Sequence, residues 1–286
     1  MSIEKVGPQL SLSLGCNAAK QTVLHRRYMA YPLSVSPLFR REEGTSRRAY
    51  LYRMNTSPGL LAGDSIGNSI QLAPESQLYL ADQSATKVHQ MPEVGTHASV
   101  NYRVSLAADS MLEFLPEPLI LFEDADLEQT TEIVMHSEAS VCWGEIVLPG
   151  RLARGEHYQF RRYLNRTKIS SLDGKLWFAE TMKLQGKGNR FVQSPLFASG
   201  AVLGTLILVL PGAIATLQNL KMLSTQIDAL ETDSPSLNLA SSVLPGDRGL
   251  FVRVMSDTTR EIQTCFKQAL NYVRALRGQN PLPYGL

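Results

Sequence analysis

The sequence has few cysteines and no long apolar run, and these absences exclude a disulfide-stapled secreted protein and a membrane-spanning protein. Cys16, Cys142 and Cys265 are far apart and odd in number, so they imply no disulfide framework and favour a reducing compartment. Residues 1–15 show no apolar segment behind a basic one, so no secretory signal is expected. The longest apolar stretch, 206–210, is far shorter than the roughly 20 residues that cross a bilayer. We therefore expect a cytoplasmic protein with no membrane partner.

The chain also lacks an excess of charge of either sign. Its 28 Lys and Arg oppose 26 Asp and Glu, which gives a formal net charge of +2. A nucleic-acid partner usually requires a strong, localised basic surplus, so none is expected. The arginines at 40, 41, 47 and 48 surround Glu42 and Glu43. This pattern favours a solvated, self-neutralised loop, with a protein-docking rim as the alternative.

No nucleotide-binding, nucleophile-elbow or zinc-protease motif is present, so we do not expect an enzyme. One alternative stays open, because acidic residues crowd positions 113–126 and two carboxylates held roughly 5 to 10 Å apart can hydrolyse a glycoside. The residues behind this hydrolase alternative are Glu113, Glu117, Glu123, Asp124 and Asp126.

Apolar and polar residues alternate with a period of two up to about residue 210, which predicts many half-buried strands. Glycine and proline cut this region into short segments. The alternating apolar positions include Leu10, Leu12, Leu14, Ile66, Ile70, Leu72, Leu78, Leu80, Val100, Tyr102, Val104 and Leu106.

The period changes after Pro211. Residues 213–230 carry an apolar stripe of helical spacing that includes Leu217. Two short strands follow at 236–240 and 249–255, and a second helix begins near Thr258 with Glu261 as its capping-box partner and stops at residue 278. We predict a single domain, 1–286, that is mainly β, with a β-rich body (1–210), a helix-strand-strand-helix end (211–278) and a loosely held tail (279–286).

The five histidines show no closely spaced metal-ligand pattern, so we expect no tightly bound cofactor. His89 with Met91 or His97 is the candidate for a weak, open nickel or zinc site, since imidazole suits both ions, and lone surface or hydrogen-bonded core histidines are the alternative.

Four segments together resemble one known family. They are SPGLLAGD (57–64), QSATKVHQ (83–90), LEFLPEPLILFEDADL (112–127) and WGEIVLPGRLARGE (143–156). In this order and at these spacings they are similar to the motifs of the urease accessory proteins of the UreD/UreH family. Leu60, Ala62 and Pro149 depart from the family pattern, as does the pair Ala81-Asp82, which indicates a divergent member.

Most of these positions suit structural roles. Pro58 and Gly59 fit a tight turn, and Asp64 fits either an Asx-turn or a functional acid. Arg151 and Glu156 can tie two turns together or form an interface rim. The family-like positions given structural roles are Pro58, Gly59, Gly63, Gln83, Thr86, Lys87, Pro116, Arg151, Gly155 and Glu156.

The resemblance implies a stacked, β-helix-like arrangement of strands with two helices near the C-terminus. It implies a scaffold that joins a heteromeric complex with UreF, the GTPase UreG and apo-urease during assembly of the nickel centre. It also implies a polar tunnel that conducts nickel, with Asp64 and Glu180 as candidates along it and His89 and His97 as further transient contacts. A UreF-docking surface is expected at the end of the last helix and the tail, where the anchors would be Arg274, Arg277 and Tyr284, with Leu282 beside them.

Overall fold

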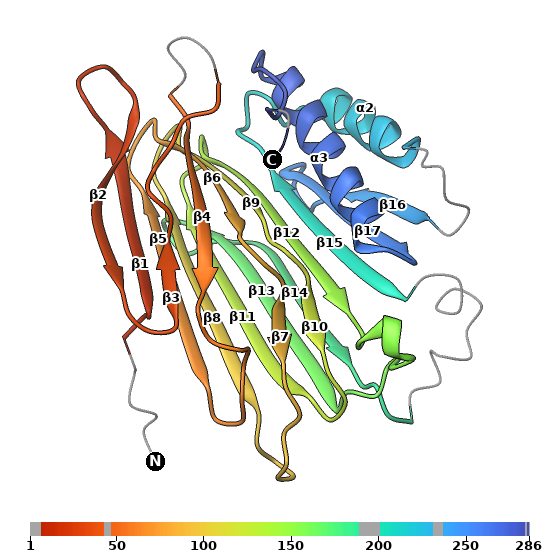
Figure 1. Ribbon diagram of the computed structural model, residues 1–286. Coiled ribbons are helices and arrows are strands. Elements are labelled where there is room, and N and C mark those ends of the chain that lie inside the picture. The colour runs from red at the N-terminus through yellow and green to blue at the C-terminus, as the bar shows by residue number, and fades with distance from the viewer. Residues whose placement is uncertain (1–6, 43–46, 189–200, 231–236, 284, 286) are drawn as a thin grey trace.

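Two β-sheets pack face to face in the computed structural model, which describes residues 7–42, 47–188, 201–230, 237–283 and 285 (Figure 1). The seven-stranded sheet has the order β14 (Leu176–Leu184), β13 (Arg162–Ser171), β11 (Asp126–Met135), β8 (Ala98–Leu106), β5 (Ser65–Leu72), β1 (Leu10–Cys16), β2 (Thr22–Met29). The ten-stranded sheet has the order β16 (Asn238–Val243), β17 (Gly249–Ser256), β15 (Val202–Val209), β12 (Ser140–Leu148), β9 (Met111–Leu115), β6 (Gln77–Asp82), β4 (Ala49–Asn55), β3 (Leu33–Val35), and β10 (Leu119–Leu121) joins β12 to β7 (Thr86–Val88).

The chain passes back and forth between the two sheets. Apart from the short strands β7 and β10, which are extra members of the ten-stranded sheet, the chain from β4 to β13 places a strand in one sheet and then in the other. Within each sheet these alternating strands pair in parallel. Each pair of strands is one coil, and the coils stack. The β-rich, stacked arrangement expected from the sequence is therefore confirmed.

The main core lies between the sheets, and a second core lies on the outer face of the ten-stranded sheet. Alternation along β12 shows both: Trp143 and Val147 belong to the inner core, while Cys142 and Ile146 belong to the outer one. A strand that is buried on both faces reads as a continuous apolar run, which explains the composition of β15.

Two helices cover the outer core (Figure 1). Helix α3 (Thr259–Leu276) begins at the predicted cap, where the Thr258 hydroxyl accepts a hydrogen bond from the Glu261 amide. Helix α2 (Leu217–Asp228) begins later than predicted because Thr216 caps it, and Leu217 is 48% exposed, so its assignment to the buried stripe was wrong. A short 3-10 helix, η1, spans Leu152–Arg154. Among the described residues, no helix is both long and apolar enough to cross a membrane.

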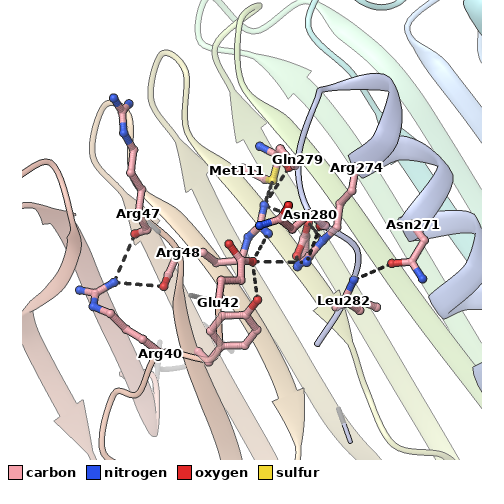
Figure 2. A network of polar contacts seen from close by, with 12 residues as sticks. Arg40, Glu42, Arg47, Arg48, Met111, Asn271, Arg274, Gln279, Asn280 and Leu282 are labelled. Carbon is pink, nitrogen blue, oxygen red and sulfur yellow. Dashed lines mark hydrogen bonds and ion pairs between the residues drawn. The ribbon is translucent and has the colours of Figure 1, made fainter. Parts of the chain in front are cut away.

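Beside α3, four charged side chains form what we call the arginine–glutamate cluster (Figure 2). Arg48, Glu113 and Arg274 are buried, and the Glu42 side chain is 12% exposed. Arg274 donates to both carboxylate oxygens of Glu113, with Nε at 3.0 Å from Oε1. Arg48 lies 3.4 Å from Glu113 and 2.7 Å from Glu42, and the Tyr50 hydroxyl donates to Glu42 at 2.6 Å. The cluster joins the segment before β4, strand β9 and the end of α3.

The cluster overturns two expectations. Arg274 was expected to be an exposed docking residue, but it is fully buried because its guanidinium pairs with Glu113. The loop of arginines was expected to be solvated, yet Arg48 is 1% exposed, and Arg40 donates to the carbonyl oxygens of Thr22 and Arg48. Charged side chains at such sites are neutralised by buried partners instead of by water.

The described part of the tail folds back onto α3. The Leu282 amide donates to the Asn271 side chain at 2.7 Å, and the Asn280 carbonyl accepts from Arg274 at 3.4 Å (Figure 2). Arg48 donates to the Gln279 side chain, and Leu282 packs against the outer core. Residues 279–283 are therefore held in place, contrary to the expected loose tail.

Truncating Arg274 tests the arginine–glutamate cluster. We expect Arg274→Ala to lower the free energy of unfolding by about 3 kcal/mol, because it leaves the Glu113 carboxylate buried with one cationic partner fewer. Arg260→Ala, at an exposed position of the same helix, should change it by less than about 0.5 kcal/mol. Urea unfolding measures both variants. Equal small effects would show that the cluster contributes little to stability.

Candidate functional site

A cavity of about 60 Å³ lies between the two sheets, and all four family-like segments contribute to its wall. Leu60 comes from the first segment, Thr86 from the second, Pro116 from the third and Glu145 from the fourth. Segments that are far apart in sequence meet there because β7, β9, β10 and β12 pair with one another or with shared neighbours in the ten-stranded sheet. A cavity of this size has room for a few water molecules.

The first polar group on the cavity wall centres on Arg53 of β4. Its guanidinium makes two bonds to Asp82 of β6, with Nε to Oδ1 at 2.6 Å and Nη2 to Oδ2 at 2.9 Å. It also donates across the sandwich to Asn68 at 3.1 Å and to the Tyr102 hydroxyl at 2.6 Å. Burial is the largest single effect on the pKa of Arg53 and lowers it, but the charges and hydrogen bonds of Asp82 and Tyr102 together raise it above its ordinary value, so the guanidinium stays charged.

The second group centres on Glu145 of β12, which is 8% exposed. Gln129 donates to its Oε1 at 2.7 Å, and Asn165 donates to its Oε2. Gln129 and Asn165 come together because they are register partners on β11 and β13. Burial raises the pKa of Glu145 to about 7, even though these side-chain amides oppose the shift. The two side chains that donate to Glu145 are neutral amides, whereas Asp82 is paired with the positively charged Arg53.

The third group lies where β14 faces β17. Glu180, whose side chain is 17% exposed, pairs with Arg253, whose side chain is 50% exposed. Phe178 and Phe251 stack beside this pair with ring centroids 5.4 Å apart. The pair therefore closes the sandwich at the side opposite the Arg53 group.

The register of the strands places these groups in two facing rows, which we call the polar layer. One row crosses the seven-stranded sheet through residues that pair directly with one another. The other row lies in the ten-stranded sheet. There Arg53 pairs with Asp82, Glu145 pairs with Thr205, and Thr205 pairs with Arg253. Hydrogen bonds or ion pairs join the two sheets at three points along or beside these rows. The row in the seven-stranded sheet is Asn68, Tyr102, Thr131, Thr167 and Glu180.

Some oxygens in this region make no hydrogen bond to the residues that the structure describes. They are Thr131 Oγ1, Tyr163 Oη and Asn165 Oδ1, and all are buried. Buried polar atoms in native proteins almost always have a partner, which is water or an ion where protein supplies none. The layer around Glu145 is therefore suited to hold water or a cation between the sheets.

Of the predicted path residues, Glu180 lies in the polar layer and Asp64 does not. The Asp64 carboxylate accepts the Leu61 amide at 2.8 Å, so it bonds within its own turn, but the donor lies three residues before it and not two residues after it as in an Asx-turn. Asp64 is not part of the cavity wall. His89 contacts the Pro58 carbonyl at 3.2 Å, and the His97 carbonyl accepts the Gly63 amide. Within the described ranges, no three His, Cys, Asp or Glu side chains gather as a metal site. Nickel contact at Asp64, His89 and His97 stays a prediction.

The family-like positions that were given structural roles do not lie together in the structure. Thr86 and Pro116 line the cavity, while Gln83 and Lys87 are exposed. Gly59 has a φ of +149° and lies against the Lys87 carbonyl, where a Cβ would come within 2.6 Å.

Arg151 and Glu156 form the expected tie between turns. They are 2.6 Å apart, and Glu156 also accepts the Glu123 amide. Gly155 ends the short helix η1 with a φ of 74°. The carboxylate of Glu156 thus joins this turn to the one that follows β10.

The carboxylates behind the hydrolase alternative do not form a pair. Glu113 belongs to the arginine–glutamate cluster, Glu117 accepts from Gln263, and Asp126 pairs with Arg162. Glu123 and Asp124 both contact Lys187. Glu113, Glu117 and Asp126 thus have separate partners, and Glu123 and Asp124 share one lysine, so the described contacts show no pair of these carboxylates held for hydrolysis.

Sequence reasoning missed Arg53, Asp82 and Glu145, and it also missed their neutral partners. A signal existed in the alternation: Gln129, Thr131, Asn165 and Thr167 occupy inward positions of strands whose other inward residues are apolar. A polar residue at an apolar phase of a strand marks either a buried network or a site.

Comparison with known proteins gives a consistent result. The family model described as UreD urease accessory protein matches residues 7–284. A protein named urease accessory protein UreD from Trichodesmium erythraeum (strain IMS101) is 45% identical over 276 residues, which cover 96% of this chain and 97% of that protein. Urease accessory protein UreD 2 of Streptomyces griseus subsp. griseus is 32% identical, with 92% and 88% covered, and a UreD protein of Actinobacillus pleuropneumoniae serotype 5b is 29% identical, with 93% and 97% covered.

The pH dependence of stability tests the burial of Glu145. Because its pKa is about 7 in the folded chain and 4.5 otherwise, the unfolded state releases this proton first as the pH rises. The wild-type chain should therefore lose about 3 kcal/mol relative to Glu145→Gln between pH 4.5 and 7, with little further change above. Glu132→Gln, at an exposed position of β11, is the control. Parallel pH profiles of unfolding for all three chains would contradict the shift.

Proposed function

The chain belongs to the UreD family of urease accessory proteins, and from this premise we propose that it is a scaffold that bridges UreF and UreG to apo-urease and conducts nickel between its two sheets. As a member of that family it takes part in urease maturation, and it does so as an accessory factor and not as an enzyme.

The observation that carries the proposal is the convergence on one cavity. The four segments that resemble the family motifs span positions 57 to 156, yet each contributes to the same wall between the sheets. If these segments served only to stabilise the coils, there would be no reason for all four to surround one space with polar residues in it. The proposed work of the site is to hold an ion or its water inside the scaffold.

The chemistry of the polar layer suits transfer better than storage. The Glu145 carboxylate and the side-chain amide oxygen of Asn165 would be oxygen ligands, whereas tight nickel or zinc sites use clustered imidazole or thiolate ligands. Nickel is therefore cargo and no tightly bound cofactor is proposed. Glu145 is the proposed central contact, and Glu180 the contact at the β14 side.

The proposed partners form a heteromeric complex. UreG, as a GTPase, would supply nickel, and UreF would dock near the end of α3, where Arg277 is half-buried and donates to the Ser140 hydroxyl. Tyr284, the other anchor, lies outside the described residues. The proposed location is the cytoplasm, in keeping with three cysteines that are all free thiols.

Reconstituted activation of apo-urease tests the conduit. We expect Glu145→Gln to lower nickel-dependent activation roughly tenfold, the usual effect of disturbing one ligand of a metal path, while the complex with UreF, UreG and apo-urease still co-purifies. Glu132→Gln should activate normally. Unchanged activation by Glu145→Gln would remove the cavity from the nickel path. Asp64→Ala is measured alongside, and unchanged activity with normal assembly would remove Asp64 from it.

Shortening the tail tests the docking surface for UreF. We expect a chain that ends at Gly278 to retain less tagged UreF, because it lacks Tyr284 and the bonds that order the end of α3. Arg26→Ala on the edge strand β2, where Arg26 is exposed, is the control. If the shortened chain retains UreF fully, docking must occur elsewhere.

A further inference from the structure

Strand β2 is an end strand of the seven-stranded sheet, and it pairs with β1 on one side only. Its outer edge is closed at Thr22, whose amide donates to the Arg47 carbonyl and whose carbonyl accepts from Arg40. From Val23 to Met29, the backbone hydrogen bonds with residues that the structure describes run to β1 alone. Alternate residues of an edge strand point their N–H and C=O groups away from the sheet, so this edge can receive another strand.

The second half of β2 is exposed on both of its faces. Leu24 still packs against the inner core, but every residue from His25 to Met29 is exposed. Side chains of a strand alternate between its two faces, and a strand in a sandwich normally buries one of the two sets. Here neither set is buried, so this half of β2 extends beyond the cover of the opposite sheet. We call residues 25–31 the β2 patch.

The composition of the β2 patch is that of a protein interface. Tyr28 is 57% exposed, Met29 is 37% exposed and Tyr31 is 75% exposed, and Arg26 and Arg27 precede them. Tyrosine, methionine and arginine are enriched at protein interfaces. Charge on an edge strand is also an ordinary protection against aggregation. Protection alone, however, gives no reason to expose two aromatic rings and a thioether beside that charge.

The charge of the β2 patch selects the kind of strand that it can receive. Arg26 and Arg27 make no ion pair with any residue in the described part of the chain. Opposite charges that face each other across paired strands stabilise the pair, and like charges destabilise it. An acidic segment therefore complements this edge. Antiparallel pairing with a second copy of β2 would instead bring the arginines of the two copies together.

The position of the β2 patch suits a second docking surface. Figure 1 shows β2 on the side of the molecule away from α2 and α3. A bridge needs two separate surfaces, and the proposed UreF surface lies at the end of α3. The inference rests on the proposed function in this respect, because UreF and UreG stand on one side of that bridge and apo-urease stands on the other.

We propose that the β2 patch binds an acidic, extended segment of apo-urease by strand addition. Main-chain hydrogen bonds add this segment to the seven-stranded sheet beside β2, which is a known mode of peptide recognition. Arg26 and Arg27 bind its carboxylates. Tyr28 and Tyr31 supply aromatic surface for its apolar side chains.

Amide hydrogen exchange tests the strand addition. The complex of this chain with UreF is measured with and without apo-urease. The outward N–H groups of residues 23–29 should exchange at least roughly tenfold more slowly when apo-urease is bound, because they become hydrogen-bonded. Strand β14, the other end strand of the same sheet, is the control and should not change. Binding of apo-urease without slower exchange in β2 would overturn the proposal, and so would slow exchange in β2 caused by dimerisation of this chain alone.

Charge reversal tests the selection of an acidic segment. Arg26→Glu combined with Arg27→Glu should weaken the retention of apo-urease at least roughly tenfold, because like charges would then face each other, while tagged UreF still co-purifies. The matched control is Arg103→Glu combined with Lys168→Glu, two exposed positions on inner strands of the same sheet, and it should retain apo-urease normally. Circular dichroism establishes that both variants are folded.

The two failures are distinguishable. If the wild-type complex retains apo-urease and the Arg26 and Arg27 double variant retains it equally well, the β2 patch is not the docking surface and the bridging function stands. If the wild-type complex retains no apo-urease, the bridging function fails and this inference fails with it. Nickel enters neither measurement, so the result is independent of the conduit.

Discussion

The register of the parallel strands is the constraint on which the interior of this protein depends. Strands β8, β11 and β13 pair in parallel without a shift along their full length, so residues at equal positions form rows across the sheet. Because side chains alternate between the two faces, a slip of one residue in a single strand would turn its whole inward set to solvent. The polar layer exists only because each coil repeats this register.

The same constraint explains why polar side chains are tolerated inside an apolar sandwich. Arg53 satisfies Asp82, Asn68 and Tyr102 at once, and Glu145 receives two amide donors. Such networks stabilise a structure when every member has its partners and destabilise it when one is lost. Replacing them with well-packed apolar residues would give a simpler core. Their presence, together with buried oxygens that no described residue satisfies, favours an interior with a task beyond stability.

Sequence patterns were sufficient for the strands, the two helices and the cap of α3, because local periodicity and capping chemistry decide those elements. They were insufficient for the burial of Arg48 and Arg274, since both arginines depend on Glu113, which is 161 residues from Arg274. The bond that Asp64 makes within its own turn depended on where the chain places the Leu61 amide. For the residues near Glu145, the period of two showed only that polar side chains occupy inward strand positions that are otherwise apolar. Which residues meet across the sandwich is a property of the stacked coils and not of any short segment.

The arginine–glutamate cluster also has a consequence for synthesis. Most contacts in the stacked coils join neighbouring coils, so the body can form progressively while the chain emerges from the ribosome. Arg274, however, completes the charge balance of Glu113 and contacts Glu42, which lies 232 residues earlier. Until translation reaches α3, Glu113 and Tyr50 on the outer face of the early coils lack this cover. The nascent body is therefore most exposed to aggregation just before α3 appears, and a chaperone or early partner would act most usefully in that interval.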